Sequence, residues 1–177
     1  NVMLSVKDLK KYFNTSNGTL HAVDNVSFDI LKGTTLGVVG ESGCGKSTLG
    51  RTVLHLLPAT SGQIVFNGRD ISKVNKHELH ELRKEMQIIF QDPFSSIDPR
   101  MSVEQLIAEP LKIHKLAKSK DEIRKKVREV MDTVGLASRL ANSYAHELDG
   151  GRRQRIGIAR ALILKPTFIS WQEAVSA

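Results

Sequence analysis

The eight residues 40–47, which read GESGCGKS, limit the kind of core that this chain can build. They fit the pattern G-x-x-x-x-G-K-[ST], in which the backbone N–H groups of a glycine-rich loop surround phosphate oxygens. The apolar, β-branched run TTLGVV at residues 34–39 precedes the loop, and leucine and valine recur at helical spacing after it. The sequence therefore predicts a buried strand, a phosphate-binding loop and a helix in a chain that binds a nucleoside triphosphate.

Each residue type in this loop has a chemical task. Glycines allow the backbone to turn tightly around an anion, and the helix that follows adds unpaired N–H groups at its first turn. The side chain of Lys46 is expected to reach the β- and γ-phosphates, and the hydroxyl of Ser47 is expected to bind Mg²⁺. The predicted nucleotide-binding residues of the loop are Gly40, Ser42, Gly43, Cys44, Gly45, Lys46, Ser47 and Thr48.

Length and composition fit one globular domain. The 177 residues carry a net charge of +7, with 40% hydrophobic and 25% charged residues. Acidic residues are interleaved with the basic ones and aromatic residues make up only 5%, which favours solvated helix faces over a nucleic-acid partner. Cys44 is the only cysteine, so an intrachain disulfide is impossible and a cytosolic setting is favoured.

The hydrophobic pattern predicts strands and helices along the rest of the chain. Period-two alternation and short apolar runs predict strands at residues 4–9, 23–30, 62–67, 87–90 and 167–171. Helical periodicity predicts helices at residues 76–86, 101–114, 121–134 and 156–164. Tyr12, which lies ahead of the loop, fits an ordinary core position and equally fits a platform for an adenine ring, so the residues alone leave both roles open.

Several motifs, in order, resemble those of one family. The segments GESGCGKST, IIFQDPFSSIDPRMSV and ELDGGRRQRIGIARAL, with a strand after Lys165-Pro166, resemble the ATP-binding subunit of an ABC transporter. The form QDPFSSIDPRMSV is similar to the oligopeptide and dipeptide importer branch in particular. The resemblance covers nearly the whole chain and implies an α/β fold, a P-loop NTPase core with an inserted α-helical subdomain.

The resemblance also implies a domain layout. It implies one ABC ATPase domain over residues 1–177, with the core at residues 1–91 and 156–177 and the helical subdomain at residues 92–155. The chain ends where the D-loop of the family begins, and the switch histidine that follows in the family is absent. We therefore expect a fragment of a longer subunit, truncated at the C-terminus.

Further site residues follow from the same resemblance. Tyr12 matches the aromatic position that stacks on adenine, and Gln91 matches a glutamine that contacts Mg²⁺ and the attacking water. Glu173 matches the catalytic glutamate, so the expected catalytic residues are Glu173, Gln91 and Lys46, and the expected metal ligands are Ser47 and Gln91.

Residues 148–154 match the signature motif, which in this family closes over the ATP of a second subunit. The resemblance therefore implies that Asp149, Gly150 and Gly151 bind nucleotide. Asp149 replaces the usual serine of this motif. It can still cap a helix, but a carboxylate repels a γ-phosphate unless an arginine or a cation lies between them.

A second departure concerns the metal. Gln172 stands where the family has a Mg²⁺-binding aspartate, and an amide lacks the negative charge that Mg²⁺ prefers. With the metal poorly held, we expect this chain to bind ATP with impaired hydrolysis.

The implied function is that of a subunit that energises ABC-type import of peptides by ATP binding and hydrolysis, with ATP and Mg²⁺ as cofactors. Expected partners are transmembrane permease subunits, a second ABC ATPase subunit and, indirectly, a periplasmic or lipoprotein substrate-binding protein. The expected location is the cytoplasmic face of the cell membrane, with no nucleic-acid partner. Two alternatives stay open: a nucleotide-binding regulatory subunit with impaired hydrolysis, and an ABC ATPase of DNA repair or translation.

Overall fold

The computed structural model describes residues 1–41, 43–90 and 97–172. The chain divides into two compact units, Asn1–His80 and Glu81–Ala177. Each unit has its own sheet and its own set of buried apolar side chains.

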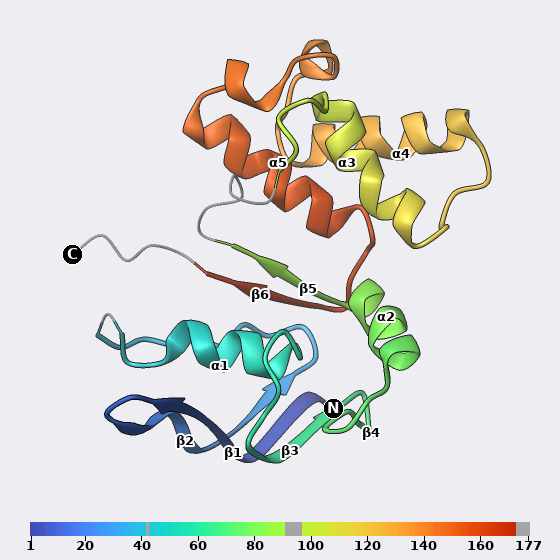
Figure 1. Ribbon diagram of the computed structural model, residues 1–177. Coiled ribbons are helices and arrows are strands. Elements are labelled where there is room, and N and C mark those ends of the chain that lie inside the picture. Colours follow the sequence, from blue (N-terminus) through green and yellow to red (C-terminus); the bar gives the residue numbers. More distant parts are fainter. Residues whose placement is uncertain (42, 91–96, 173–177) are drawn as a thin grey trace. The chain divides into compact units, whose positions relative to one another are not determined.

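The first unit is built on a four-stranded antiparallel sheet. Strand β1 (Val2–Thr15) pairs with β2 (Gly18–Leu31) on one side and with β3 (Ser61–Phe66) on the other, and β4 (Arg69–Asp70) completes the order β2-β1-β3-β4 (Figure 1). The strands predicted at residues 4–9, 23–30 and 62–67 are confirmed. The first two strands extend beyond their predicted ranges, because their pairing continues to a two-residue turn at residues 16–17.

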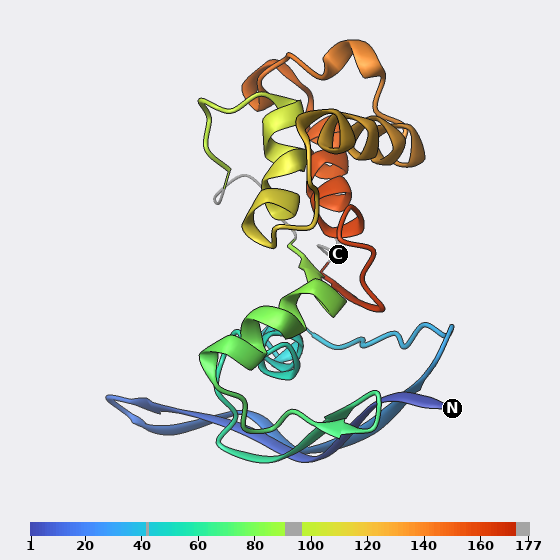
Figure 2. The ribbon, with the colours of Figure 1, turned by 90° about the vertical axis from the view of Figure 1, so that its right-hand side faces the viewer.

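Helix α1 (Lys46–Val53) lies across one face of this sheet (Figure 1; Figure 2). The helix predicted after the phosphate loop is thereby confirmed, although it is short. It ends at Val53 because His55 adopts a left-handed conformation with φ of 56°, which an α-helix cannot continue. The buried apolar residues of this unit are Leu4, Val6, Leu9, Val23, Val53, Leu54, Ile64, Phe66 and Ile71.

The strand predicted at residues 34–39 is wrong. These residues form neither strand nor helix, and the side chain of Val39 is 93% exposed. A buried strand exists only where a neighbouring strand accepts and donates its backbone hydrogen bonds. In the described part of the chain no strand pairs with this segment.

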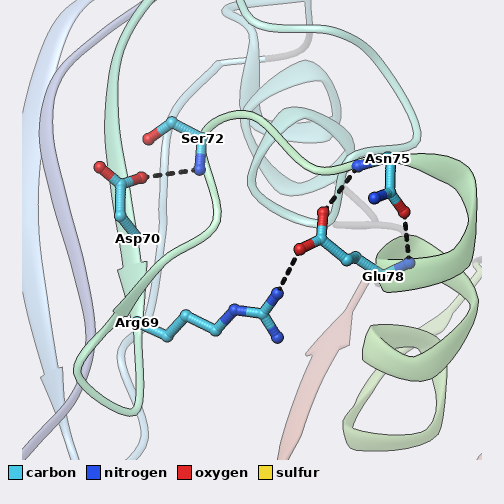
Figure 3. Close-up of polar contacts among 5 residues, drawn as sticks. All are labelled: Arg69, Asp70, Ser72, Asn75 and Glu78. Atoms are coloured by element: carbon cyan, nitrogen blue, oxygen red, sulfur yellow. Dashed lines mark hydrogen bonds and ion pairs between the residues drawn. The ribbon is translucent and has the colours of Figure 1, made fainter.

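Polar side chains hold the connection from β4 to helix α2 (Lys76–Glu85), as Figure 3 shows. Asn75 and Glu78 cap the helix reciprocally: the backbone N–H of each donates to the side chain of the other at 2.9 Å. Nη2 of Arg69 lies 2.8 Å from Oε1 of Glu78. One carboxylate therefore ties the helix start to the strand, and Asp70 stiffens the turn between them by accepting from the backbone N–H of Ser72 at 2.8 Å.

The second unit contains a parallel strand pair and a layer of helices. Strand β5 (Met86–Ile89) pairs in parallel with β6 (Phe168–Trp171), which confirms both predicted strands. Parallel pairing needs a long crossover, and the segment between these strands supplies it. This segment includes three helices, α3 (Val103–Ile113), α4 (Lys120–Thr133) and α5 (Gly150–Leu162).

The three helices share one apolar core. Val127 and Met131 of α4, Leu106 of α3 and Ile156 of α5 are at most 1% exposed in the same cluster. Each helix begins at a side-chain cap, which is Ser102, Ser119 or Asp149. Helix α5 starts six residues earlier than its apolar periodicity predicts, because Asp149 caps it ahead of its first buried side chain.

Candidate functional site

The glycine-rich loop has the close backbone approach that its pattern predicts. Gly45 has φ of 98° and immediately precedes α1. A Cβ atom at Gly45 would lie 2.1 Å from the carbonyl oxygen of Ala22 on β2, so only glycine fits this position. The loop therefore contacts the sheet at the point where the helix begins.

The ammonium of Lys46 lies inside this loop. Its Nζ donates a hydrogen bond to the carbonyl of Gly40 and another, at 3.0 Å, to the carbonyl of Glu41. A cation held by neutral carbonyls inside a glycine-rich turn is placed to attract an anion, and the positive end of the α1 helix dipole lies at the same place. The arrangement fits a phosphate group.

Of the other predicted loop residues, Gly43 and Cys44 are exposed, and Ser47 and Thr48 lie in the first turn of α1. Ser42 lies outside the described residues. Among the described residues, no group of three His, Cys, Asp or Glu side chains is placed to hold a metal ion. Ser47 is thus the one predicted metal ligand whose position the structure describes.

Tyr12 lies in β1, half-buried, and takes part in a polar and aromatic cluster that no sequence motif predicts. Its ring stacks on His21, and its hydroxyl donates a hydrogen bond to Asp24 at 2.5 Å. This hydrogen bond raises the pKa of Tyr12 and lowers the pKa of Asp24. The β-hairpin is the signal that could have indicated this cluster, because two strands that pair on either side of a short turn bring residues 12 and 21 together.

Asp149, Gly150 and Gly151 form the start of α5. Oδ1 of Asp149 accepts the backbone N–H of Arg152 at 2.8 Å, and Oδ2 lies 3.9 Å from Nε of Arg152. The cap predicted for Asp149 is confirmed. A cavity of about 350 Å³ opens beside it, lined by Gly135, Ala137, Arg139, Leu140, Asp149, Gly151, Arg152 and Arg155.

Gln91 and Glu173, two of the predicted catalytic residues, lie outside the described residues. The strands that lead toward them end side by side, because Ile89 at the end of β5 is paired with Trp171 at the end of β6. The backbone N–H of Gln172 donates to the carbonyl of Ile89 at 2.9 Å and so extends this pairing by one residue. Carboxyl ends of adjacent parallel strands are a common place for ligand sites in α/β folds.

Comparison with known proteins places the chain in a family. A family model described as ABC transporter matches residues 23–176. The chain is 53% identical over 176 residues to the oligopeptide transport ATP-binding protein OppF of Bacillus subtilis (strain 168), covering 99% of this chain and 58% of that protein. It is 48% identical over 176 residues to OppF of Haemophilus influenzae, covering 99% of this chain and 53% of that protein. The chain thus spans little more than half the length of these curated relatives.

A solved structure shows the same fold. The dimeric structure of a post-hydrolysis state of the ATP-binding cassette MJ0796, bound to ADP and Pi, matches this chain with a TM-score of 0.88 and 28% sequence identity. The match covers 99% of this chain and 75% of that one. The α/β fold of an ABC ATPase cassette is therefore confirmed. No helix among the described residues is long and apolar enough to cross a membrane.

Proposed function

The chain belongs to the ABC transporter family, and we propose on that premise that it is part of an ATP-binding subunit that energises peptide import. The observation that carries the proposal is the placement of the Lys46 ammonium within a glycine-rich loop at the start of α1. The names of the two OppF proteins, each an oligopeptide transport ATP-binding protein, support peptides as the cargo.

The proposed reaction is hydrolysis of ATP by in-line attack of water on the γ-phosphate. Lys46 neutralises charge on the β- and γ-phosphates, and Ser47 together with Gln91 binds Mg²⁺. Glu173 acts as the base that accepts a proton from the attacking water. Bound Mg²⁺ would neutralise charge that develops on the phosphate oxygens.

The proposed partners follow from the same family. A second ATP-binding subunit pairs with this one, and Asp149, Gly150 and Gly151 face the nucleotide that the partner holds. Transmembrane permease subunits contact the helical subdomain, proposed at residues 92–155, on the cytoplasmic face of the membrane, and a substrate-binding protein delivers the peptide to the permease. The dimeric state of MJ0796 supports pairing.

ATP binding is the first test. Lys46→Ala is expected to weaken binding of Mg-ATP to this chain at least tenfold, because a charge-assisted contact to phosphate is lost. Lys76→Ala removes an exposed lysine from the start of α2 and serves as the matched control. Equal affinity of the Lys46→Ala variant and the parent chain, measured by calorimetric titration, would remove the proposal's basis.

Hydrolysis is tested on the longer subunit assembled with its permease. Phosphate release above that of a Glu173→Gln variant is the expected result, because the base is then absent from the variant. The same measurement separates this proposal from the alternative of a nucleotide-binding regulatory subunit, for which both proteins would bind ATP and release no phosphate.

A further inference from the structure

The hairpin of β1 and β2 carries a stacked pair of rings. Tyr12 and His21 are register partners, and their ring centroids lie 3.9 Å apart with an angle of 11° between the ring planes. This is a parallel stack, so His21 covers one face of the tyrosine ring. A planar ligand that stacks on Tyr12 while His21 stays in place must therefore use the opposite face of the ring.

Asp24 holds the same tyrosine by its hydroxyl. The Tyr12 hydroxyl donates to Oδ1 of Asp24 at 2.5 Å, and Oδ2 of Asp24 lies 3.8 Å from Nδ1 of His21. The ring of Tyr12 is therefore held at its face by one side chain and at its tip by another. Because the ring is already restricted before a ligand arrives, less side-chain conformational entropy is lost on binding.

A bulge in β2 brings these three side chains together. The register passes from Lys11 paired with Val23 to Tyr12 paired with His21, so Ala22 is the extra residue. In a regular strand His21 and Asp24, three residues apart, would face opposite sides of the sheet. The bulge turns both of them toward Tyr12.

The same bulge joins the cluster to the phosphate loop. The carbonyl oxygen of Ala22 lies where a Cβ atom of Gly45 would be 2.1 Å away, so the loop contacts β2 at the residue next to His21. A nucleotide whose phosphates lie in that loop is therefore close to this aromatic cluster. The cluster does not serve the core, since the side chains of His21 and Asp24 are 52% and 53% exposed.

We propose that His21 and Asp24 are positioning residues for the nucleotide base: His21 backs one face of Tyr12 and Asp24 holds its hydroxyl, so that the other face receives a purine. The result is a stack of three planes, with the imidazole, the phenol and the base in that order. The inference rests on the proposed function, in that the phosphates of the same nucleotide bind at Lys46.

The test separates binding of the base from binding of the phosphates. The full chain is titrated calorimetrically with Mg-ATP and with magnesium tripolyphosphate, which has the phosphates and no base. His21→Ala is expected to weaken ATP binding about three- to tenfold, the range for loss of one aromatic stack, and to leave tripolyphosphate binding unchanged. Asp24→Ala is expected to weaken ATP binding about two- to fivefold, with the same selectivity.

Rescue and control variants exclude a merely structural effect. His21→Phe keeps a stacking ring and is expected to bind ATP within about twofold of the parent chain. His77→Ala removes an exposed histidine from α2 and is expected to change neither affinity. If His21→Ala weakens ATP and tripolyphosphate equally, or if His21→Phe is as weak as His21→Ala, the positioning role is wrong.

Failure of this inference is distinct from failure of the proposed function. If Tyr12→Ala weakens ATP binding while His21→Ala and Asp24→Ala leave it unchanged, the inference is overturned and the base site at Tyr12 stands. If Tyr12→Ala has no effect, the inference and the base site are both overturned. Nucleotide binding at the loop is then still tested separately by the Lys46→Ala variant.

Discussion

The carboxylate of Asp149 contacts Arg152 twice: Oδ1 accepts the backbone N–H of Arg152 at 2.8 Å, and Oδ2 lies 3.9 Å from its Nε. The first contact caps α5, because it satisfies an N–H group that has no partner inside the helix. The second places a positive charge beside the carboxylate. An aspartate at this position is thus accompanied by its own counter-charge.

Loss of the cap should be measurable as stability. We expect Asp149→Ala to lower the free energy of unfolding by about 0.5–2 kcal/mol, the usual range for an N-cap. Asp149→Ser keeps a capping oxygen and is expected to stay close to the parent chain. Asp132→Ala, which removes an exposed carboxylate from the last turn of α4, is the control. Urea unfolding of the four proteins makes the comparison, and equal midpoints for Asp149→Ala and Asp149→Ser would contradict it.

The counter-charge should matter for hydrolysis in the assembled subunit pair. Arg152→Gln leaves the Asp149 carboxylate without its cation, and we expect phosphate release to fall on the order of tenfold. In the double variant Asp149→Ser/Arg152→Gln both charges are gone, so activity should return toward the parent value. Arg128→Gln on the exposed face of α4 is the control. An unchanged rate in the single variant would show that the pair has no role at the partner's nucleotide.

The approach of Gly45 to Ala22 predicts a steric effect on the loop. Gly45→Ala places a Cβ atom 2.1 Å from the Ala22 carbonyl oxygen and also imposes a positive φ on alanine. Gly33→Ala imposes a positive φ, at 77°, with nothing within 4 Å of the new atom, so it isolates the conformational cost of about 1–2 kcal/mol. We expect Gly45→Ala to weaken Mg-ATP binding at least tenfold and Gly33→Ala to leave it unchanged. Similar affinities for both variants would refute the steric argument.

Asp70 should make the first unit sensitive to acid. Hydrogen bonds from Ser72 and Gln63 lower the pKa of its carboxyl from the usual 3.8 to about 2. Because the folded-state pKa lies below the unfolded-state value, the contribution is fully present above about pH 4 and is lost as the pH falls through about 2. We expect Asp70→Asn to reduce the loss of stability between pH 4 and pH 2. Asp29→Asn, an exposed carboxylate on β2, is the control. The measurement is thermal unfolding followed at several pH values, and parallel pH profiles for Asp70→Asn and the parent chain would argue against this role.

The sequence alone determines the features that depend on neighbouring residues. The loop pattern predicts where α1 begins, which is at Lys46, and the apolar periodicity predicts the buried face of α4, with Val127 and Met131 fully covered. The sequence also predicts that Asp149 caps α5. Hydrogen bonds and side-chain contacts within one or two helical turns depend on spacing along the chain, so a pattern of residues is enough to predict them.

Only the tertiary structure shows the contacts that depend on pairing between distant segments. Tyr12, His21 and Asp24 meet because the bulge at Ala22, one of several register shifts between β1 and β2, changes which residues of the two strands face each other, and no local pattern predicts a bulge. Residues 34–39 have the composition of a buried strand, yet Val39 is 93% exposed, because a strand needs a neighbour and composition does not provide one. Local spacing therefore determines the phosphate loop and its helix, whereas strand register determines what surrounds Tyr12.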